Sequence, residues 1–411
     1  MTQLNKVGPA SASHVTGPPA STPDDADVGA ARAVSVQGRA ALATHRHELE
    51  RLLARIDAPV TARMTWLEIW AAHHPRWEPW VIAVRGDDRV LEAAALLAFR
   101  RRGPFAEVVL LGHGPSDRAC LPALSRSAAA RLAAEIDAGL GALRRPWRLR
   151  LRQLPADDPV ACELARCLPR HRFVHGLGSP RVRFDEGRSL AAHASRNYRS
   201  QAKHKWNQLE RAGASPTLII SRDPGEIADR LPEVMRVCRQ RDIEIAGQSP
   251  LDDAAYRSFF ESLILAHAQR DEIELTVLLA SDRVAAYSLA FLDGRAYRQW
   301  NKHLDSEWGQ FKPGQVLDHR LLQRLLAEAE FDELDWMAGE EAYKLRTATD
   351  TVAASTLLAW SSPVIRALDT TEILMDRLRP FVIARPALSR AHQRVRAARI
   401  RARQWRRGSS R

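Results

Sequence analysis

The chain is poor in the residues and runs that mark several protein classes. Only 4 cysteines occur among its 411 residues, too few for the disulfide framework of a small secreted domain. The apolar runs, such as residues 90–99, are far shorter than the roughly 20 residues needed to cross a bilayer. The N-terminus also lacks the basic-then-apolar order of a secretory signal. We therefore expect a cytoplasmic protein with reduced thiols.

Familiar catalytic and metal-binding signatures are missing as well. The sequence has no Gly-x-Ser-x-Gly elbow, no Gly-rich phosphate loop ending in Lys-Ser/Thr, no His-Glu-x-x-His and no Gly-x-Gly-x-x-Gly. Cys162, Cys167, His171 and His175 lie close in sequence, but the gap between the two cysteines departs from the usual two-residue spacing of zinc ligands. We expect buried cysteines and surface histidines there, and no metal.

Acidic residues are absent from one long stretch, and that stretch explains the overall charge. Of the formal net charge of +12, ten units come from arginines in residues 385–411, which contain no Asp or Glu, so the rest of the chain carries +2. The basicity thus belongs to an appendage and does not describe the folded surface. Residues 363–411 are expected to form a helical basic tail that contacts an anionic membrane surface, nucleic acid or an acidic partner, or that is simply solvated.

The remaining composition is that of a globular protein of two or three domains, because 45% of the residues are hydrophobic and the length exceeds a single core. Residues 1–40 are rich in Ser, Pro, Gly, Ala and Asp and are expected to be disordered. Strands and helices alternate in residues 41–185 and again in 186–362, which predicts two α/β (α+β) domains. Residues 351–362 are expected to supply a final strand to the second domain.

The stretch from Arg295 to Arg346 carries the most information. Residues 295–303 alternate large and polar side chains, as a half-buried strand does, and a polar loop follows. Residues 315–330 predict an amphipathic helix and residues 331–337 a second strand. Residues 338–346 form a turn crowded with ionisable groups.

The start of the predicted helix suggests a site for an anion. Pro313 and Gly314 precede it, and the first turn of a helix presents unpaired N–H groups and the positive end of the helix dipole. Such a terminus binds phosphate groups, including the pyrophosphate of a nucleotide-like cofactor. The alternative is that Pro313 and Gly314 only form a turn.

Two groups of residues resemble a known family. The first group is Pro313, Gly314, Gln315, Val316, Leu317, Asp335, Gly339, Tyr343, Lys344, Leu345 and Arg346; the second is Ser195, Arg196, Asn197, Tyr198, Arg199, Leu209 and Gly213. Together with the order of elements, they resemble the GNAT acyltransferases. They are most similar to the bacterial CelD-like group associated with cellulose and exopolysaccharide biosynthesis. The resemblance covers about residues 60 to 350 and implies two tandem GNAT-like domains with mixed central sheets, a layout also seen in the Fem-type peptidoglycan ligases.

The resemblance implies acyl-CoA, such as acetyl-CoA, as the co-substrate, held by the backbone of Phe311, Lys312, Pro313, Gly314 and Gln315. The residues expected to be catalytic are Asp335, Tyr343, Lys344 and Glu340. Lys344 is expected to neutralise a phosphate or an oxyanion, and Tyr343 to return a proton to the leaving thiolate. The residues expected to bind the acceptor are Asn197, Arg199, Trp300, Asn301 and His303, and His303 is also a candidate for the base that deprotonates it. The N-terminal domain has no comparable cluster, so we expect it to be structural or to shape the substrate site.

Three functions remain open on this evidence. The first is an acyl-CoA-dependent acyltransferase that acts on a sugar, an amine or an envelope precursor. The second is an aminoacyl-tRNA-dependent ligase like the Fem group, which the near-neutral body makes less favoured. The third is a catalytically silent binding module of a polysaccharide assembly system.

Overall fold

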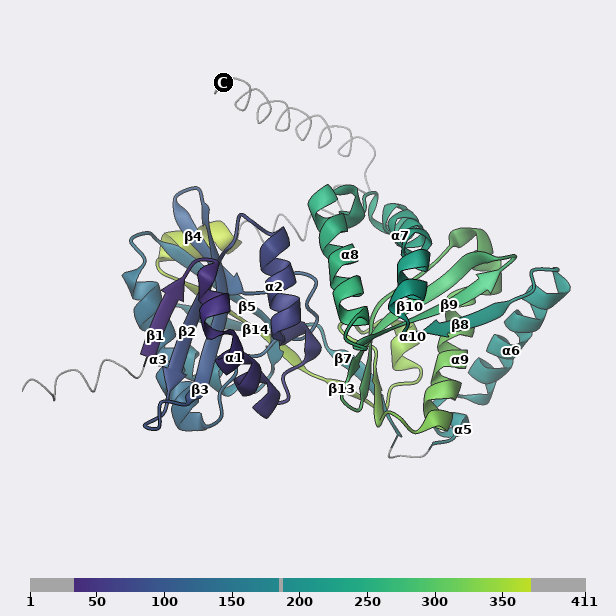
Figure 1. Ribbon diagram of the computed structural model, residues 1–411, viewed down its shortest axis with the longest axis horizontal. Coiled ribbons are helices and arrows are strands. Elements are labelled where there is room, and N and C mark those ends of the chain that lie inside the picture. The colour runs from purple at the N-terminus through teal and green to yellow at the C-terminus, as the bar shows by residue number, and fades with distance from the viewer. Residues whose placement is uncertain (1–32, 185–187, 371–411) are drawn as a thin grey trace, which may run out of the picture.

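The computed structural model describes residues 33–184 and 188–370, which form two lobes side by side (Figure 1). Each lobe is built around a mixed sheet of seven strands with helices on its faces. We call the lobe that begins the chain the N-terminal unit and the other the C-terminal unit. The predicted fold, two tandem α/β units with mixed central sheets, is confirmed.

The N-terminal sheet has the strand order β1-β2-β3-β4-β5-β14-β6. Its central pair, β4 and β5, is parallel, and its other pairs are antiparallel. The strands are β1 (Ala33–Gln37), β2 (Glu78–Arg85), β3 (Leu91–Arg102), β4 (Phe105–Leu110), β5 (Trp147–Pro155), β6 (His171–His175) and β14 (Ala354–Trp360). The helices of this unit are α1 (Ala40–Arg55), α2 (Met64–His73), α3 (Arg126–Ala142) and α4 (Pro159–Cys167), with a 3-10 turn at Val60–Ala62.

The C-terminal sheet repeats this plan with the order β13-β7-β12-β11-β10-β9-β8, and β11 and β12 are its parallel pair. The strands are β7 (Ser179–Arg183), β8 (Thr217–Ser221), β9 (Ile273–Ala280), β10 (Arg283–Asp293), β11 (Ala296–Leu304), β12 (Glu333–Asp335) and β13 (Asp350–Val352). The helices are α5 (Leu190–His193), α6 (Arg196–Arg211), α7 (Pro224–Ala246), α8 (Ala254–Ala268), α9 (Pro313–Glu328) and α10 (Ala342–Leu345), with 3-10 turns at Pro250–Asp252 and Ser306–Phe311.

The two sheets exchange strands. After β6 the chain crosses from the N-terminal sheet and forms β7 between β12 and β13, and after β13 it crosses back and forms β14 between β5 and β6. At the crossing, a Cβ on Gly178 would crowd the carboxylate of Glu340 and lie 2.7 Å from Thr351 Cγ2, so a larger residue there requires these side chains to shift. Our placement of residues 351–362 as a strand of the second domain was therefore wrong for β14, because its apolar residues pack into the N-terminal core.

The predicted terminal segments lie mostly outside the described residues. Two parts do not. Residues 33–37, which we assigned to the disordered segment 1–40, form β1 along the antiparallel edge of β2. The alternation of Val34 and Val36 with polar neighbours suits a strand at the edge of a sheet. Of the predicted helical tail, residues 363–370 are helical, and the Arg-rich segment falls outside the described residues.

A shared apolar core joins the units. Helices α1 and α2 of the N-terminal unit and α7 and α8 of the C-terminal unit contribute to one cluster of buried residues. Trp66 on α2 makes edge-to-face contacts with Phe259, Phe291 and Trp300 at centroid distances of 6.3, 5.7 and 5.7 Å. Aromatic contacts of this kind stabilise a core beyond the area they bury, so the units form one body. No helix of the described residues is long and apolar enough to cross a membrane.

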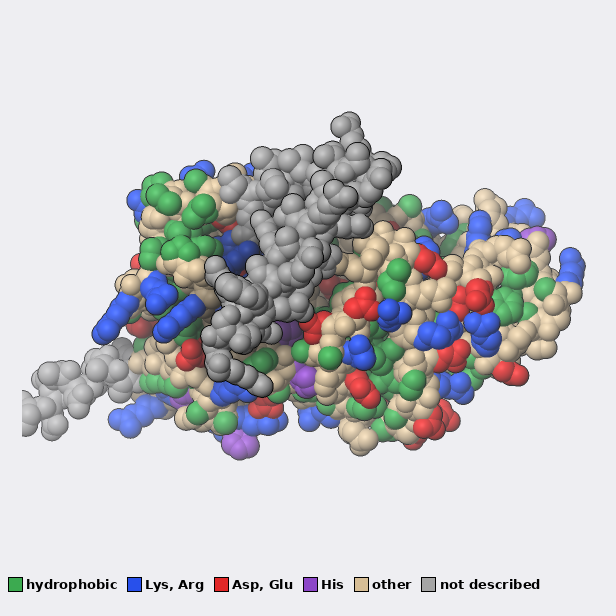
Figure 2. Space-filling view, turned by 90° about the horizontal axis from the view of Figure 1, so that it is seen from above, with side chains coloured by type: hydrophobic (Ala, Val, Ile, Leu, Met, Phe, Trp, Pro, Cys, Tyr) green, Lys and Arg blue, Asp and Glu red, His purple; other side chains and the backbone are tan. Residues whose placement is uncertain are grey.

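The surface of the C-terminal unit agrees with a body near neutrality. Acidic and basic side chains are interspersed over this unit on the face seen from above in Figure 2. Many of them are paired, as in the ion pairs of Arg222 with Glu330 (2.7 Å) and of Arg241 with Glu244 (2.9 Å). Such a mixed surface has no extended field of one sign.

Candidate active site between the two units

The parallel strands of the C-terminal sheet separate at their ends. Strand β11 pairs with β12 only from Ala296 to Arg298, and β11 then continues to Leu304 without that neighbour. The chain after β12 instead runs alongside residues 178–180, because Trp336 N donates to Pro180 O and Gly339 N donates to Gly178 O. The result is a gap between residues 299–304 and 336–339.

Helix α9 begins beside this gap with an uncapped N-terminus. Lys312 takes a left-handed conformation (φ 49°) and provides no side-chain cap, and Pro313 starts the helix. Gln315 N and Val316 N both donate to Lys312 O, whereas the Gly314 N–H has no acceptor among the described residues. The first turn of α9 therefore presents an unpaired N–H within the loop, Phe311 to Gln315, that we expected to hold a phosphate.

Three side chains, from β11, α9 and α10, meet beside the gap between the strands. Lys302 Nζ on β11 contacts Asp318 Oδ2 on α9 at 2.7 Å and lies 3.8 Å from the centre of the Tyr343 ring. Burial lowers the pKa of Lys302, and the charge of Asp318 opposes that shift. Burial also raises the pKa of Tyr343, which keeps its phenol protonated at neutral pH. The α9 end and the Tyr343–Lys344 segment therefore border the same gap.

Lys344 lies buried beneath the turn that follows β12. Its ammonium group donates to Ala338 O at 2.8 Å and pairs with Glu341 at 3.0 Å. Met337 in this turn has a left-handed φ of 57°, a strained conformation for a side chain other than glycine. Glu340 is exposed and faces the crossing strands at Gly178.

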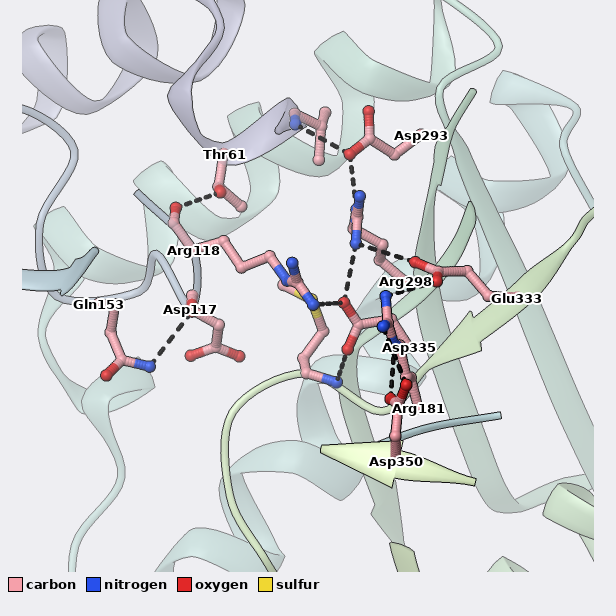
Figure 3. A network of polar contacts seen from close by, with 12 residues as sticks. Thr61, Asp117, Arg118, Gln153, Arg181, Asp293, Arg298, Glu333, Asp335 and Asp350 are labelled. Atoms are coloured by element: carbon pink, nitrogen blue, oxygen red, sulfur yellow. Dashed lines mark hydrogen bonds and ion pairs between the residues drawn. The ribbon is translucent and has the colours of Figure 1, made fainter. Parts of the chain in front are cut away.

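Asp335 is the centre of an ion-pair network between the units (Figure 3). It is fully buried and forms ion pairs with Arg118 Nη2 at 2.6 Å and Arg298 Nη1 at 2.8 Å, and it accepts from Met337 N at 2.9 Å. Two guanidinium groups and a backbone N–H already occupy this carboxylate, and it has no exposed surface for an acceptor to reach. We therefore assign Asp335 a positioning role in place of the catalytic role we expected.

The predicted acceptor-binding residues of β11 lie on the α7–α8 side of the sheet. A bulge opposite Leu289 and Ala290 makes Trp300 the extra residue of the strand, so Trp300 faces the same side as Asn301 and His303. Trp300 packs on Phe260 and donates to Pro115 O at 3.1 Å. Trp300 therefore joins the two units and is partly buried. Asn301 accepts from Tyr287 at 2.5 Å.

The two predicted acceptor-binding residues of α6 have different surroundings. Asn197 is exposed and accepts from Gln201 on the same helix. Arg199 is half-buried. Burial is the main cause of the lowered pKa of His319 on α9, and the charge of Arg199 adds to this shift. Of the two, only Arg199 is directed towards α9.

Asp117, a residue that we did not predict from the sequence, lies near Lys344. Asp117 lies in the loop after β4, and burial raises its pKa to about 7; the charge of Lys344 opposes this shift, and Asp335 and Glu341 add to it. A carboxyl group with a pKa near neutrality is suited to general base catalysis. Only the Gly, Pro and Ser residues around it marked this segment as a loop, and no motif pointed to the carboxylate.

Asp117 lines a cavity of about 430 Å³ where β4 and β5 of the N-terminal unit separate. The inner wall is apolar, with residues such as Leu67, Leu110 and Leu358. Three arginines also line the cavity, Arg150, Arg152 and Arg172, and Arg150 is paired with Asp369. His113 and His175 belong to the lining too, but burial lowers the pKa of His113 to about 4, so this histidine is neutral. Ala338, whose carbonyl oxygen holds Lys344, closes the cavity from the C-terminal unit. A ligand in this cavity would meet residues of both units.

Comparison with known proteins agrees with this geometry. Residues 196–345 match the family model of the acetyltransferase (GNAT) domain. No curated protein matches the sequence.

Solved structures show the same fold over most of the chain. One is FemX, with 11% identity and a TM-score of 0.52, covering 76% of this chain and 95% of that one. Another is the C-terminal domain of a putative lysylphosphatidylglycerol synthetase from Agrobacterium fabrum, with 10% identity and a TM-score of 0.51, covering 81% and 96%. Residues 196–345 of this chain are therefore similar in sequence to a GNAT-type acetyltransferase domain, and the chain shares its fold with these structures.

Proposed function

We propose that this protein transfers an acyl group from acyl-CoA to an amine or hydroxyl acceptor. The observation that carries the proposal is the uncapped end of α9 beside the gap between β11 and β12, inside the matched GNAT domain. The Gly314 N–H and the helix dipole suit the pyrophosphate of CoA. Arg199 of α6 adds a cation on the α9 side.

The acceptor binds in the cavity of the N-terminal unit under this proposal. Its basic lining suits an acceptor that carries a phosphate or carboxylate, and its apolar wall suits a hydrophobic portion. Asp117 takes the proton from the acceptor nitrogen or oxygen, which attacks the thioester carbonyl. The C–S bond then breaks and CoA leaves as a thiol, with Tyr343 as the proton donor.

Lys344 and Lys302 supply positive charge near the reacting groups. Lys344 also orders the turn at Ala338, and Lys302 lies between Asp318 and Tyr343. Glu340 is exposed at the strand crossing, so we keep it at the margin of the site.

The biological setting that we propose is polysaccharide or cell-envelope biosynthesis in the cytoplasm, on the CelD-like residues described above. The arginines of residues 385–411 suit an anionic membrane surface where such acceptors are held.

The test is acyl-CoA binding and turnover by wild type and Asp117→Asn. Calorimetry with acetyl-CoA and longer acyl-CoAs is expected to show binding to both proteins, because Asp117 lies on the acceptor side. In the variant, kcat is expected to fall by about 10²–10⁴-fold. Asp229→Asn, an exposed carboxylate on α7, is the matched control. Absence of binding to every acyl-CoA contradicts the proposal, and unchanged biological activity in Asp117→Asn favours the binding module.

The pH dependence gives a second measurement. Wild-type kcat/KM is expected to rise as the pH passes about 7, where Asp117 loses its proton, and the variant lacks this limb. The folded protein holds this proton more tightly than the unfolded chain, whose pKa is near 3.8. The contribution of Asp117 to stability is therefore full below about pH 4 and is lost as the pH rises to about 7. Chemical denaturation at several pH values checks this sign.

A second candidate, transfer from an aminoacyl-tRNA as in the Fem group, is favoured by one surface feature. A hollow on the N-terminal unit is lined by five arginines and two aromatic residues: Arg39, Arg76, Arg100, Arg101, Arg102, Trp77 and Phe99. Arginine and aromatic side chains together suit a nucleic-acid backbone and its bases. This candidate predicts tRNA binding that weakens steeply with salt, and acyl-CoA binding without tRNA binding excludes it.

A further inference from the structure

Three side chains that are able to bind a metal ion meet on the α7–α8 side of β11. Cys238 and Asp242 lie one turn apart on α7, and His303 projects from β11. Their ligand atoms all lie within 4.8 Å of one another. Because a helix and a strand of one packed unit hold them, their separation is fixed by the fold.

The neighbouring groups orient these side chains without occupying them fully. The Ser249 hydroxyl donates to Asp242 Oδ2 at 2.7 Å, and Cys238 Sγ lies 3.9 Å from the same oxygen. Neither ring nitrogen of His303 hydrogen-bonds to a side chain or backbone group of the described residues. Burial lowers the pKa of His303, so the imidazole is neutral and keeps a lone pair at physiological pH.

We propose that Cys238, Asp242 and His303 form a zinc site. A thiolate, an imidazole and a carboxylate are the donors that Zn²⁺ takes in proteins, whereas Ca²⁺ and Mg²⁺ require oxygen donors. Three protein ligands leave a fourth position for water, and Asp242 and His303 are partly exposed, which gives the ion a way in. Ser249 is the outer-shell residue that holds the carboxylate. From the sequence we expected no metal in this protein, so this proposal departs from that expectation.

Binding must displace one proton. Burial raises the pKa of the Cys238 thiol to about 11, so the thiol is protonated at neutral pH without a metal. When Zn²⁺ binds, the S–H bond breaks, sulfur bonds to the metal, and the proton passes to the buffer. Calorimetric titration in two buffers of different ionisation enthalpy counts this proton.

The experiment uses the full chain, treated with a chelator and then titrated with Zn²⁺ or Co²⁺. One equivalent is expected to bind, and Co²⁺ is expected to give the near-ultraviolet absorption of a cobalt–thiolate bond. Cys238→Ser removes that band. His303→Gln weakens the affinity more than about 100-fold, and Ser249→Ala by about 10–100-fold, as is typical of outer-shell residues. Cys167→Ser, an exposed thiol on α4, is the control that retains the band.

The His303→Gln variant is expected to fold even if Cys238→Ser does not, because the His303 side chain is partly exposed and Cys238 is buried. Zinc is expected to raise the Tm of the wild type and of Cys167→Ser, and to leave that of His303→Gln unchanged. Absence of stoichiometric binding by the wild type overturns the site. So does a Cys238→Ser variant that keeps the cobalt–thiolate band. No acyl-CoA enters these measurements, so their outcome is independent of the acyltransferase proposal.

Discussion

The helix that follows the first strand of the parallel pair begins differently in the two units. In the C-terminal unit, β11 leads through a short 3-10 turn into α9, whose first turn lacks a side-chain cap. In the N-terminal unit, the Ser125 hydroxyl caps α3 by accepting from Ala128 N at 3.1 Å. Capping satisfies the N–H groups that an anion would need. Helix α3 of the N-terminal unit is therefore less suited than α9 to bind a phosphate.

The loops before the two helices differ as well. Residues 111–120 of the N-terminal unit reach into the other unit, where Pro115 O accepts from Trp300 and Arg118 pairs with Asp335. This loop then returns to pair with β3 at Ala93 and Ala123. The C-terminal copy of the fold therefore has the uncapped helix end at which we propose that the cofactor binds, and the N-terminal copy supplies a cavity, a carboxylate and the docking loop, residues 111–120.

The largest expected effect comes from separating the units. A chain of residues 33–184 lacks β14, and a chain of residues 188–370 lacks β7, and each missing strand lies between two others in its sheet. Neither piece is expected to unfold cooperatively, whereas residues 33–370 are. Circular dichroism during thermal unfolding measures this. A piece of residues 33–184 that melts as cooperatively as the longer chain would show that the sheets do not depend on the exchange.

A smaller effect on stability is expected from a substitution in the docking loop, residues 111–120. Arg118→Ala removes one partner of the fully buried Asp335, and the arginine side chain itself is 23% exposed. Losing one partner of a buried ion pair costs about 3 kcal/mol of unfolding free energy. Arg101→Ala, at an exposed arginine of β3, is expected to change stability by less than about 0.5 kcal/mol. Urea denaturation distinguishes them, and equal stabilities would remove the loop from the interface.

The smallest effect directly compares the two helix ends. Gln315→Glu places a negative charge in the first turn of α9 and is expected to weaken acyl-CoA binding by about 10-fold, or about 1.4 kcal/mol. Ser127→Glu does the same in α3 and is expected to leave that affinity unchanged. Calorimetry with acetyl-CoA measures both, and a loss in the α3 variant alone would assign the cofactor to the N-terminal unit.

The local sequence pattern predicted many of the helices and strands but few of the contacts between them. The four-residue spacing of leucines placed α9, and the Pro-Gly pair placed its start, because these signals depend on neighbours in sequence. Strict period two in β11 fails at Trp300, because a bulge is set by the partner strand β10. Lys302 lies within the strand we described, yet its pairing with Asp318 depends on how α9 packs.

The amino-acid sequence by itself determined the duplicated α/β plan, a helix beginning within two residues of Pro313 and the concentration of charge in residues 385–411, since each follows from spacing and composition. The tertiary structure alone decided that β7 and β14 change sheets, that Asp335 is held by two arginines and that Asp117 lies near Lys344. These are meetings of residues far apart in the chain. Their energies come from burial and desolvation, which no local pattern records.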